Sequence, residues 1–310
     1  MRVLVVTNLW PTPESPARGG FVRDQVEALQ RIEGVEVELF TFGVGSREYL
    51  RAAAEARRRY RNESFDVVHA HYGLCGWTAL PIRGAPHVVT FHGTDLAHRW
   101  VGPLSRTLAH LIDLPAPVSA SLARAGLPHA LDPVAVLPCG VNLDRFHRMD
   151  RREARAALGL DPDAPYLLFP ADPARPEKRF DRARALADSA GVELLKYEQR
   201  PPEQVPLMIN AANAVLVTSE REGFGLAPLE ALACDVPVLA TDVGIAPLAL
   251  EGVDGTLCAP FDPAAWAAAL APPLRAADPR VDGRPRAALF DRNRLAERVF
   301  RAYQDLAGTA

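Results

Sequence analysis

The sequence predicts an α/β protein with two facing, doubly wound Rossmann-like domains and a cleft between them. Short apolar runs bounded by loops alternate with segments of helical spacing through both halves of the 310-residue chain. This alternation is typical of parallel sheets covered by helices. We interpret residues 147–165, which end in an acidic, proline-containing turn, as the linker. An N-terminal domain is therefore placed at residues 1–148 and a C-terminal domain at residues 149–293.

The composition is that of a globular protein and narrows the function classes. Apolar residues make up 48% of the chain, charged residues 24%, and the net charge of −3 gives no basic field for nucleic acid. The four cysteines form no C-x-x-C pair, so we expect neither a zinc site nor a disulfide framework, and a cytoplasmic location. No apolar run reaches the roughly 18 residues of a transmembrane helix. The start of the chain fits a first strand better than a signal peptide.

The first half is predicted to contain short apolar strands and two helices. The strands are expected at Arg2–Thr7, Val35–Thr41, Phe65–His71, His87–Phe91 and Val134–Pro138. Helices are predicted at Phe21–Arg31 and Arg47–Arg61. The second helix is rich in arginine, which suits a solvated face or, alternatively, an anionic membrane surface.

The second half repeats the alternation of strand and helix. Strands are expected at Tyr166–Pro170, Val192–Leu195, Ala214–Val217, Pro237–Ala240 and Gly255–Pro260. Helices are expected at Phe180–Ala190, Pro206–Ala212, Leu226–Ala233, Phe261–Leu270 and Arg294–Leu306.

Residues 218–244 combine the features of a ligand site in an open parallel sheet. An apolar strand leads into a loop with Glu222, Gly223 and Gly225, and a helix with Glu230 near its start follows. Ligands of such sheets lie at the carboxyl ends of the strands, and glycines let the backbone approach them closely. The free N–H groups of a helix start suit a phosphate, whereas the two glutamates can accept hydrogen bonds from hydroxyl groups.

Polar residues also collect after strands of the first half. The Gly19-Gly20 turn leads into a helix and can bring backbone amides against a phosphate. His69 and His71 share one face of a strand, but no third metal ligand is evident nearby, so no metal site is predicted. The next strand runs directly into His92-Gly93-Thr94-Asp95.

These motifs together resemble family 4 retaining glycosyltransferases. E-G-F-G-L-A-P-L-E resembles the E-x7-E motif of that family, and the following P-V-L-A-T-D-V-G resembles its P-V-V-A-x-x-x-G run. H-A-H-Y-G, T-F-H-G-T-D and V-S-A-S-L resemble further family segments, so the resemblance covers nearly the whole chain. It implies the glycosyltransferase-B architecture, in which the final helix, residues 294–310, crosses back onto the first domain.

The resemblance also implies roles for individual residues. Catalysis would depend on His92, Glu222, Arg175 and Lys178. The donor would be bound by Gly19, Gly20, Arg175, Lys178, Gly223, Phe224, Gly225, Leu226 and Glu230, and its base by the loop Lys196–Arg200. The acceptor would contact His71, Tyr72, Thr94 and Asp95. No metal and no other cofactor would be needed, because side chains and helix dipoles stabilise the leaving diphosphate.

The chain departs from the family pattern at several positions. Where the family has G-R-x-x-x-x-K-G, the usual arginine position falls on Asp172 or Pro173. Lys178 keeps its place, and Arg175 is the expected substitute for the arginine, because a guanidinium can pair with a diphosphate. Where the family has P-N-G-V-D, this chain has Cys139 for Asn and Asn142 for Asp.

The expected function is transfer of a sugar from a nucleotide sugar, UDP in preference to GDP, to a glycan or lipid-linked acceptor with retention of configuration. The closest resemblance is to cell-wall and exopolysaccharide transferases of the teichuronic-acid type. A lipid-linked acceptor would bring the Arg47–Arg61 helix to the inner membrane face. Three alternatives stay open: a sugar-nucleotide epimerase, a non-catalytic nucleotide-sugar-binding subunit, and a retaining glycosidase. A glycosidase needs two carboxyl groups about 5–5.5 Å apart across one sugar.

Overall fold

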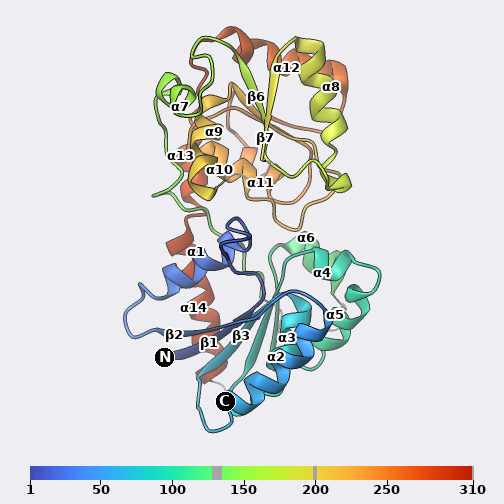
Figure 1. Ribbon diagram of the computed structural model, residues 1–310, viewed down its shortest axis with the longest axis vertical. Helices are drawn as coiled ribbons and strands as arrows, with labels where there is room; N and C mark the ends of the chain where they lie inside the picture. Colours follow the sequence, from blue (N-terminus) through green and yellow to red (C-terminus); the bar gives the residue numbers. More distant parts are fainter. Residues whose placement is uncertain (128–134, 198–200, 309–310) are drawn as a thin grey trace. The chain divides into compact units, whose positions relative to one another are not determined.

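The computed structural model describes residues 1–127, 135–197 and 201–308, and it consists of two compact units (Figure 1). The first unit combines Met1–Gly140 with the C-terminal segment from Arg292, and the second unit is Val141–Asp291. The division therefore falls after Gly140, whereas the sequence analysis places it after residue 148. The final helix is part of the first unit; its predicted last residues, 309 and 310, lie outside the described part of the chain.

The first unit is built on a five-stranded parallel sheet in the order β2-β1-β3-β4-β5. Its strands are β1 (Arg2–Thr7), β2 (Glu36–Thr41), β3 (Val67–His71), β4 (His87–Phe91) and β5 (Leu114–Pro117). Successive side chains of a strand point to opposite faces, so both faces of this apolar sheet must be covered. In β1, Val3 and Val5 belong to one apolar cluster, and Leu4 and Val6 belong to the other.

Helices cover the two faces of this sheet (Figure 1). Helix α1 (Gly20–Leu29) and the C-terminal α14 (Arg292–Gly308) pack on the face of Val3 and Val5. Helices α2 (Ser46–Arg59), α3 (Gly73–Ala79) and α5 (Val101–Ala109) pack on the other face. The short α4 (Thr94–Ala97) and α6 (Ala120–Gly126) follow β4 and β5.

The second unit contains another five-stranded parallel sheet, in the order β10-β9-β8-β6-β7. Its strands are β6 (Tyr166–Phe169), β7 (Glu193–Lys196), β8 (Ala214–Val217), β9 (Val238–Ala240) and β10 (Leu257–Cys258). Helices α8 (Phe180–Ala190) and α12 (Pro263–Arg275) share one core cluster with the sheet. Helices α9 (Val205–Ala211) and α10 (Ala227–Ala233) pack against β6, β8 and β9 outside that cluster. The remaining helices are α7 (Arg151–Ala157), α11 (Ala246–Leu250), α13 (Arg284–Ala288) and two 3-10 turns, Pro176–Lys178 and Pro202–Gln204.

Both sheets have the same topology, which confirms the predicted α/β class. Numbered within its own unit, each sheet has the strand order 2-1-3-4-5. In this doubly wound order the connections leave in opposite directions from the first and third strands, and ligands bind beside the carboxyl ends of those two strands. Ligand-binding loops are therefore expected after β1 and β3 in the first unit and after β6 and β8 in the second.

The predicted strand Val134–Pro138 is wrong in its described part, residues 135–138, which has no regular structure. Leu137 donates a single backbone hydrogen bond to the carbonyl oxygen of Pro117 in β5. Strand β5 contains prolines at positions 115 and 117, which have no N–H to donate. A continuous ladder therefore cannot form beside it. The predicted strand Gly255–Pro260 is also shorter, since only Leu257 and Cys258 pair with β9.

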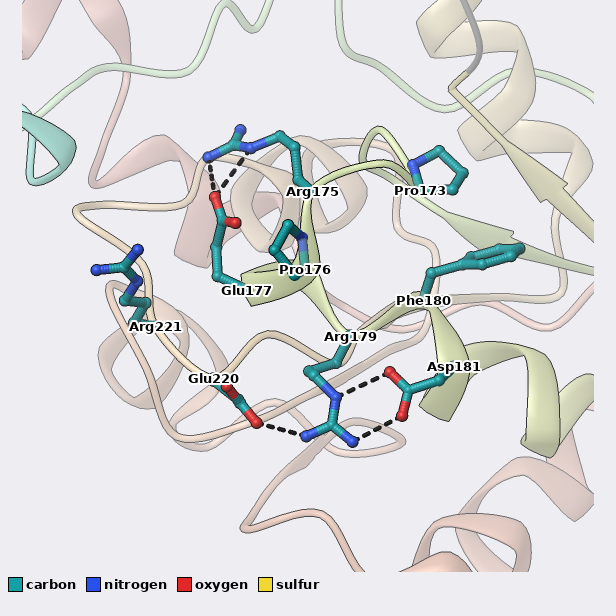
Figure 2. A pocket seen from close by; sticks show the side chains of 9 residues that line it. All are labelled: Pro173, Arg175, Pro176, Glu177, Arg179, Phe180, Asp181, Glu220 and Arg221. Carbon is teal, nitrogen blue, oxygen red and sulfur yellow. Dashed lines mark hydrogen bonds and ion pairs between the residues drawn. The ribbon is translucent and has the colours of Figure 1, made fainter. Parts of the chain in front are cut away.

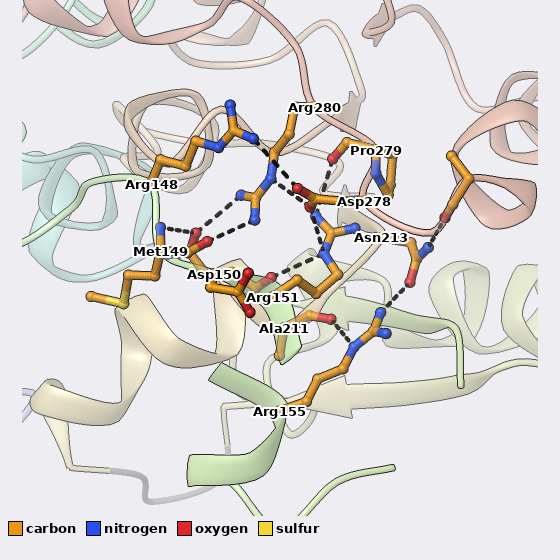
Figure 3. A network of polar contacts seen from close by, with 12 residues as sticks. Arg148, Met149, Asp150, Arg151, Arg155, Ala211, Asn213, Asp278, Pro279 and Arg280 are labelled. Carbon is orange, nitrogen blue, oxygen red and sulfur yellow. Dashed lines mark hydrogen bonds and ion pairs between the residues drawn. The ribbon is translucent and has the colours of Figure 1, made fainter. Parts of the chain in front are cut away.

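The predicted linker 147–165 contains helix α7 instead of being irregular throughout. Asp150 caps this helix by accepting a hydrogen bond from the backbone N–H of Glu153 at 3.0 Å. Its buried arginines Arg151 and Arg155 donate to the carbonyl oxygens at positions 210 and 211, so they hold α7 against the end of α9 (Figure 3). Sequence reasoning treats arginines as surface residues and for this reason missed the helix.

Candidate active site

Lys178 and Glu222 meet at the switch point of the second sheet. Lys178 ends the 3-10 turn after β6, and Glu222 lies in the loop after β8. The ammonium Nζ of Lys178 lies 2.6 Å from Glu222 Oε1 and 2.7 Å from Oε2. The two side chains are only 13% and 11% exposed. Both residues are among the expected catalytic residues, and the structure brings them together.

A hydrogen bond and two closely packed glycines restrict the conformation of the Glu222 side chain. Ser219 donates a hydrogen bond to Glu222 Oε1 at 2.7 Å. Gly244 has a positive φ of 61°, and a Cβ on it would lie 2.7 Å from the Cβ of Glu222 and would collide with the carbonyl oxygen of Phe224. Gly225 also has a positive φ, of 79°, so these two positions require glycine.

The two loops of this site are joined to each other. Thr218 donates to the carbonyl oxygens of Lys178 and Arg179 at 3.1 and 2.9 Å. The backbone N–H of Glu220 donates to the carbonyl oxygen of Glu177 at 2.9 Å. Arg179 adopts the left-handed conformation, with φ and ψ of 54°, where the family pattern has glycine. Glycine adopts this conformation without strain, so the glycine of the family pattern would fit the same turn.

Arg175 does not join the Lys178–Glu222 pair. Its guanidinium donates to Glu177 Oε1 at 3.0 and 2.7 Å, and its side chain is 49% exposed. Figure 2 shows this pair in a cavity of about 770 Å³. The cavity is lined by Pro173, Arg175, Pro176, Glu177, Arg179, Phe180, Asp181, Glu220 and Arg221. Arg179 pairs there with Asp181 and Glu220, so most of the charge in this cavity is neutralised internally.

The other predicted donor residues lie on the loop and helix that follow Glu222. Leu226 precedes α10, and Glu230 lies in the first turn of that helix. Gly223 is partly exposed, whereas Phe224 is buried. Tyr197, which the sequence analysis did not single out, has a buried hydroxyl without a hydrogen-bond partner in the described structure. Burial, and then the Glu230 carboxylate, raise its pKa well above the ordinary value. Residues 198–200 of the predicted base-binding loop lie outside the described residues.

In the first unit, the Gly19-Gly20 turn opens α1 beside the end of β1. Gly19 has a positive φ of 63°, and a Cβ there would collide with the carbonyl oxygen of Leu9. A Cβ on Gly20 would meet no atom within 4 Å. Glycine is therefore required at position 19 by its backbone conformation and close packing, whereas a side chain at position 20 would meet open space.

Three histidines form a column along the ends of β3 and β4. The rings of His69 and His71 stack with centroids 4.4 Å apart, and His71 Nδ1 lies 3.2 Å from His92 Nε2. His69 Nδ1 lies 2.5 Å from the hydroxyl of Tyr303 in α14, and its Nε2 lies 2.7 Å from Thr90 Oγ1. Sequence reasoning predicted the shared face of His69 and His71 but not Tyr303, which is 234 residues from His69.

Burial keeps this column uncharged. It lowers the pKa of His69 and of His92 to about 3, and it lowers the pKa of His71 well below the ordinary value. At neutral pH each ring therefore has one N–H donor and one acceptor nitrogen. His92 can form hydrogen bonds to a neutral ligand group but carries no positive charge.

Asp95 organises the loop that carries His92. Its carboxylate accepts backbone hydrogen bonds from His92 at 3.1 Å, from Gly93 at 2.8 Å and from Gly73 at 3.1 Å. Burial raises its pKa to about 6 although these hydrogen bonds favour the charged form. Of the four predicted acceptor residues, Thr94 is exposed, Tyr72 is partly buried, and His71 and Asp95 are buried.

The departures from the family pattern have local explanations. Asn142 is buried, and its Oδ1 accepts from the backbone N–H groups of Asp144 and Arg145 at 3.2 and 3.1 Å. An aspartate makes the same turn, so Asn142 replaces it without loss of structure. Burial raises the pKa of the Cys139 thiol to about 12, which keeps it protonated.

The described residues contain neither a metal-ligand cluster nor a membrane-spanning helix. Within residues 1–127, 135–197 and 201–308, no three His, Cys, Asp or Glu side chains are arranged to hold a metal ion. Within the same ranges, no helix has the length and apolar character needed to cross a bilayer.

Known protein families match both halves of the chain. A family described as "Glycosyltransferase Family 4" matches residues 2–145, and one described as "Glycosyl transferases group 1" matches residues 162–275. The D-inositol 3-phosphate glycosyltransferase of Mycolicibacterium paratuberculosis is 32% identical over 339 residues, covering 90% of this chain and 73% of the relative. The protein of the same name from Actinosynnema mirum is 33% identical, covering 77% of this chain and 70% of the relative.

Solved structures support the fold. The sucrose-phosphate synthase of Thermosynechococcus elongatus has a TM-score of 0.74 at 21% identity and covers 100% of this chain and 99% of that chain. HepE of Anabaena, solved with UDP and glucose, has a TM-score of 0.72 at 15% identity and covers 98% of this chain and 99% of that chain. At these identities the likeness establishes a shared fold and no more.

Proposed function

This chain belongs to the glycosyltransferases that the two matching families describe, and we propose that it transfers a sugar from a UDP-sugar with retention of configuration. The acceptor is a glycan or lipid-linked sugar of cell-wall or exopolysaccharide type. The D-inositol 3-phosphate glycosyltransferases among the relatives add D-inositol 3-phosphate to the acceptors that an assay must include.

The observation that carries this proposal is the Lys178–Glu222 pair at the β6/β8 switch point. A nucleotide sugar presents a diphosphate and hydroxyl groups within one ligand. The ammonium of Lys178 suits the diphosphate, and the carboxylate of Glu222 suits sugar hydroxyls. Glu230, eight residues further along and in the first turn of α10, is assigned to the ribose hydroxyls.

The reaction breaks the bond between the anomeric carbon and the diphosphate oxygen, and forms a bond from that carbon to the acceptor oxygen. The acceptor proton passes to the departing phosphate oxygen on the same face, so no side chain is needed as base. Lys178 stabilises the negative charge that grows on the diphosphate. Arg175 can add to this after leaving Glu177, because exposed ion pairs are weak. The proposal needs no metal ion or other cofactor.

His92 is assigned to the donor sugar as a neutral hydrogen-bonding group. Its lowered pKa fits contact with a sugar hydroxyl better than pairing with phosphate. The Nε2 atom of His92 already forms a hydrogen bond with Nδ1 of His71, so the sugar would contact the other ring nitrogen of His92, Nδ1. Thr94 and Tyr72 are assigned to the acceptor.

A peripheral membrane contact through α2 completes the proposal for a lipid-linked acceptor. Arg57 and Arg58 are exposed on this helix, and Leu50 is 76% exposed. The wild-type protein should bind vesicles that contain anionic lipid, and the double variant Arg57→Glu/Arg58→Glu should not bind them. The control variant Arg298→Glu/Arg301→Glu, changed on α14, should bind like the wild type. Equal binding by all three proteins would remove the membrane role.

A thermal-shift panel tests the donor class. Uridine, guanosine and adenosine diphosphates and their sugars are added to wild type, Lys178→Ala and Glu230→Ala. A ligand at 100 times its dissociation constant stabilises by about 2.7 kcal/mol. We expect the uridine series to shift the wild type and neither variant. A well-folded wild type that no nucleotide sugar shifts would contradict the proposal.

A further inference from the structure

Lys178 and Glu222 use most of their bonding capacity on each other. Both carboxylate oxygens of Glu222 contact the same ammonium group, and the hydroxyl of Ser219 occupies a further site on Oε1. Neither Lys178 nor Glu222 forms another ion pair in the described parts of the chain. The two groups that the proposed function assigns to different parts of the donor therefore neutralise each other in the free protein.

Glu222 cannot simply turn away when Lys178 finds another partner. Gly225 and Gly244 pack against its side chain, where a Cβ on either residue would lie 3.1 Å or less from it. Ser219, which holds the carboxylate, is itself fixed, since its carbonyl oxygen accepts from Thr241 Oγ1 at 2.6 Å. A ligand that draws Lys178 away therefore leaves a largely buried carboxylate behind without its cation. Such a charge is strongly destabilising.

We propose that this ion pair exchanges partners on donor binding and thereby selects the intact nucleotide sugar over the free nucleoside diphosphate. The inference rests on the proposed function. A nucleoside diphosphate draws Lys178 to its phosphates and offers Glu222 nothing in return. A nucleotide sugar also supplies O–H groups that donate to the carboxylate in place of the ammonium. After transfer the sugar has gone, and renewed pairing of Lys178 with Glu222 favours release of the diphosphate.

Calorimetric titration with UDP and with UDP-glucose tests the exchange on the full chain. Glu222→Gln keeps the shape of the side chain but removes the charge that competes for Lys178. We expect the variant to bind UDP about tenfold more tightly than the wild type, equal to about 1.4 kcal/mol. The preference of the wild type for UDP-glucose over UDP should disappear. If UDP-glucose is not the donor, the same pair of titrations is made with UDP-N-acetylglucosamine.

Glu220→Gln is the matched control. It removes a carboxylate two residues away that pairs with Arg179 and Arg182 instead of Lys178. We expect it to change the affinity for UDP by less than about twofold, because exposed ion pairs contribute little. An equal gain in both variants would mean that general charge, and not the pair, controls binding, and would overturn the inference. Unchanged or weaker UDP binding by Glu222→Gln would overturn it as well.

A second measurement needs no variant. The chain has two lysines, Lys178 and Lys196, so selective ¹³C labelling of lysine gives two Cε signals in NMR spectra. The exchange predicts that UDP shifts the Lys178 signal as its carboxylate partner is replaced by phosphate. Bound UDP with an unmoved Lys178 signal would overturn the inference and leave the proposed function intact. Failure of wild type to bind any UDP compound would instead refute both.

Discussion

Tyr303→Phe offers a sharp test of the histidine column, in which His69 and His71 are buried and His92 is partly exposed. The Tyr303 hydroxyl lies 2.5 Å from His69 Nδ1, and both side chains are fully buried. Phenylalanine keeps the ring and its packing in the core but leaves the nitrogen of His69 without its partner. The substitution therefore isolates one hydrogen bond between α14 and β3.

The expected loss follows from that geometry. Leaving a buried polar group unsatisfied costs about 1–3 kcal/mol. A loss of about 2 kcal/mol should lower the melting temperature of the first unit by about 4–8 °C. Tyr197→Phe is the control, since the hydroxyl of Tyr197 is buried without a partner in the described structure. Its removal should leave stability unchanged or raise it.

Urea unfolding and ¹⁵N NMR of the histidine rings provide the two readouts. The column predicts that Tyr303→Phe lowers the free energy of unfolding and changes the tautomer populations of His69. Because His69 stacks on His71, which contacts His92, a smaller change should reach the His92 signal. A stability equal to that of wild type, with unchanged ring signals, would refute the hydrogen bond and the column built on it.

Three further predictions concern the packing and charge of the two units. Gly244→Ala should destabilise the second unit by more than about 2 kcal/mol, because alanine is strained at positive φ and its Cβ would meet a carbonyl oxygen; a melt like that of wild type would contradict this. Arg292→Met should cost about 3–5 kcal/mol of unfolding free energy, because it removes the cation 3.6 Å from the buried Asp24, with side chains 5% and 4% exposed; a loss below about 1 kcal/mol would count against that ion pair. His69 and His92 have a pKa of about 3 when folded against an ordinary 6.5, so the unfolded chain binds these protons first and stability should fall by about 1.4 kcal/mol per histidine for each pH unit below about 6. Asp95, with a folded pKa of about 6, binds its proton first in the folded chain and offsets about one of the two histidines. Urea melts between pH 7 and pH 5 test this, and a flat profile would show that the histidines are not buried as neutral groups.

The positions of most strands could be predicted from the sequence. The order of the strands in the sheet, which decides which loop residues meet, could not. Short Val- and Leu-rich runs correctly placed β1, β3, β4, β6 and β8, since strands buried on both faces need apolar side chains. Lys178 and Glu222 are 44 residues apart, and they meet because β6 pairs directly with β8 while β7 lies at the sheet edge. A single sequence does not state that strand order.

The failures of sequence reasoning also have physical causes. Helix α7 was missed because its buried face is made by Arg151 and Arg155, whose charges find carbonyl oxygens only in the folded chain. The strand at 134–138 was predicted from apolar content alone, which ignores that the prolines of β5 cannot donate to a ladder. The Arg175–Glu177 ion pair could not be read from a motif position, and the donor role of Arg175 stays a prediction.

Real-time proton NMR of sugar transfer tests the central claim most directly. The protein is incubated with UDP-sugars and a panel of glycan, lipid-linked and inositol phosphate acceptors, beside Lys178→Ala and Glu222→Ala. We predict that one donor loses its sugar to an acceptor, that UDP accumulates, and that the anomeric coupling of the product matches that of the donor. Both variants should lose this activity. Transfer with inverted configuration, or full activity in either variant, would contradict the account.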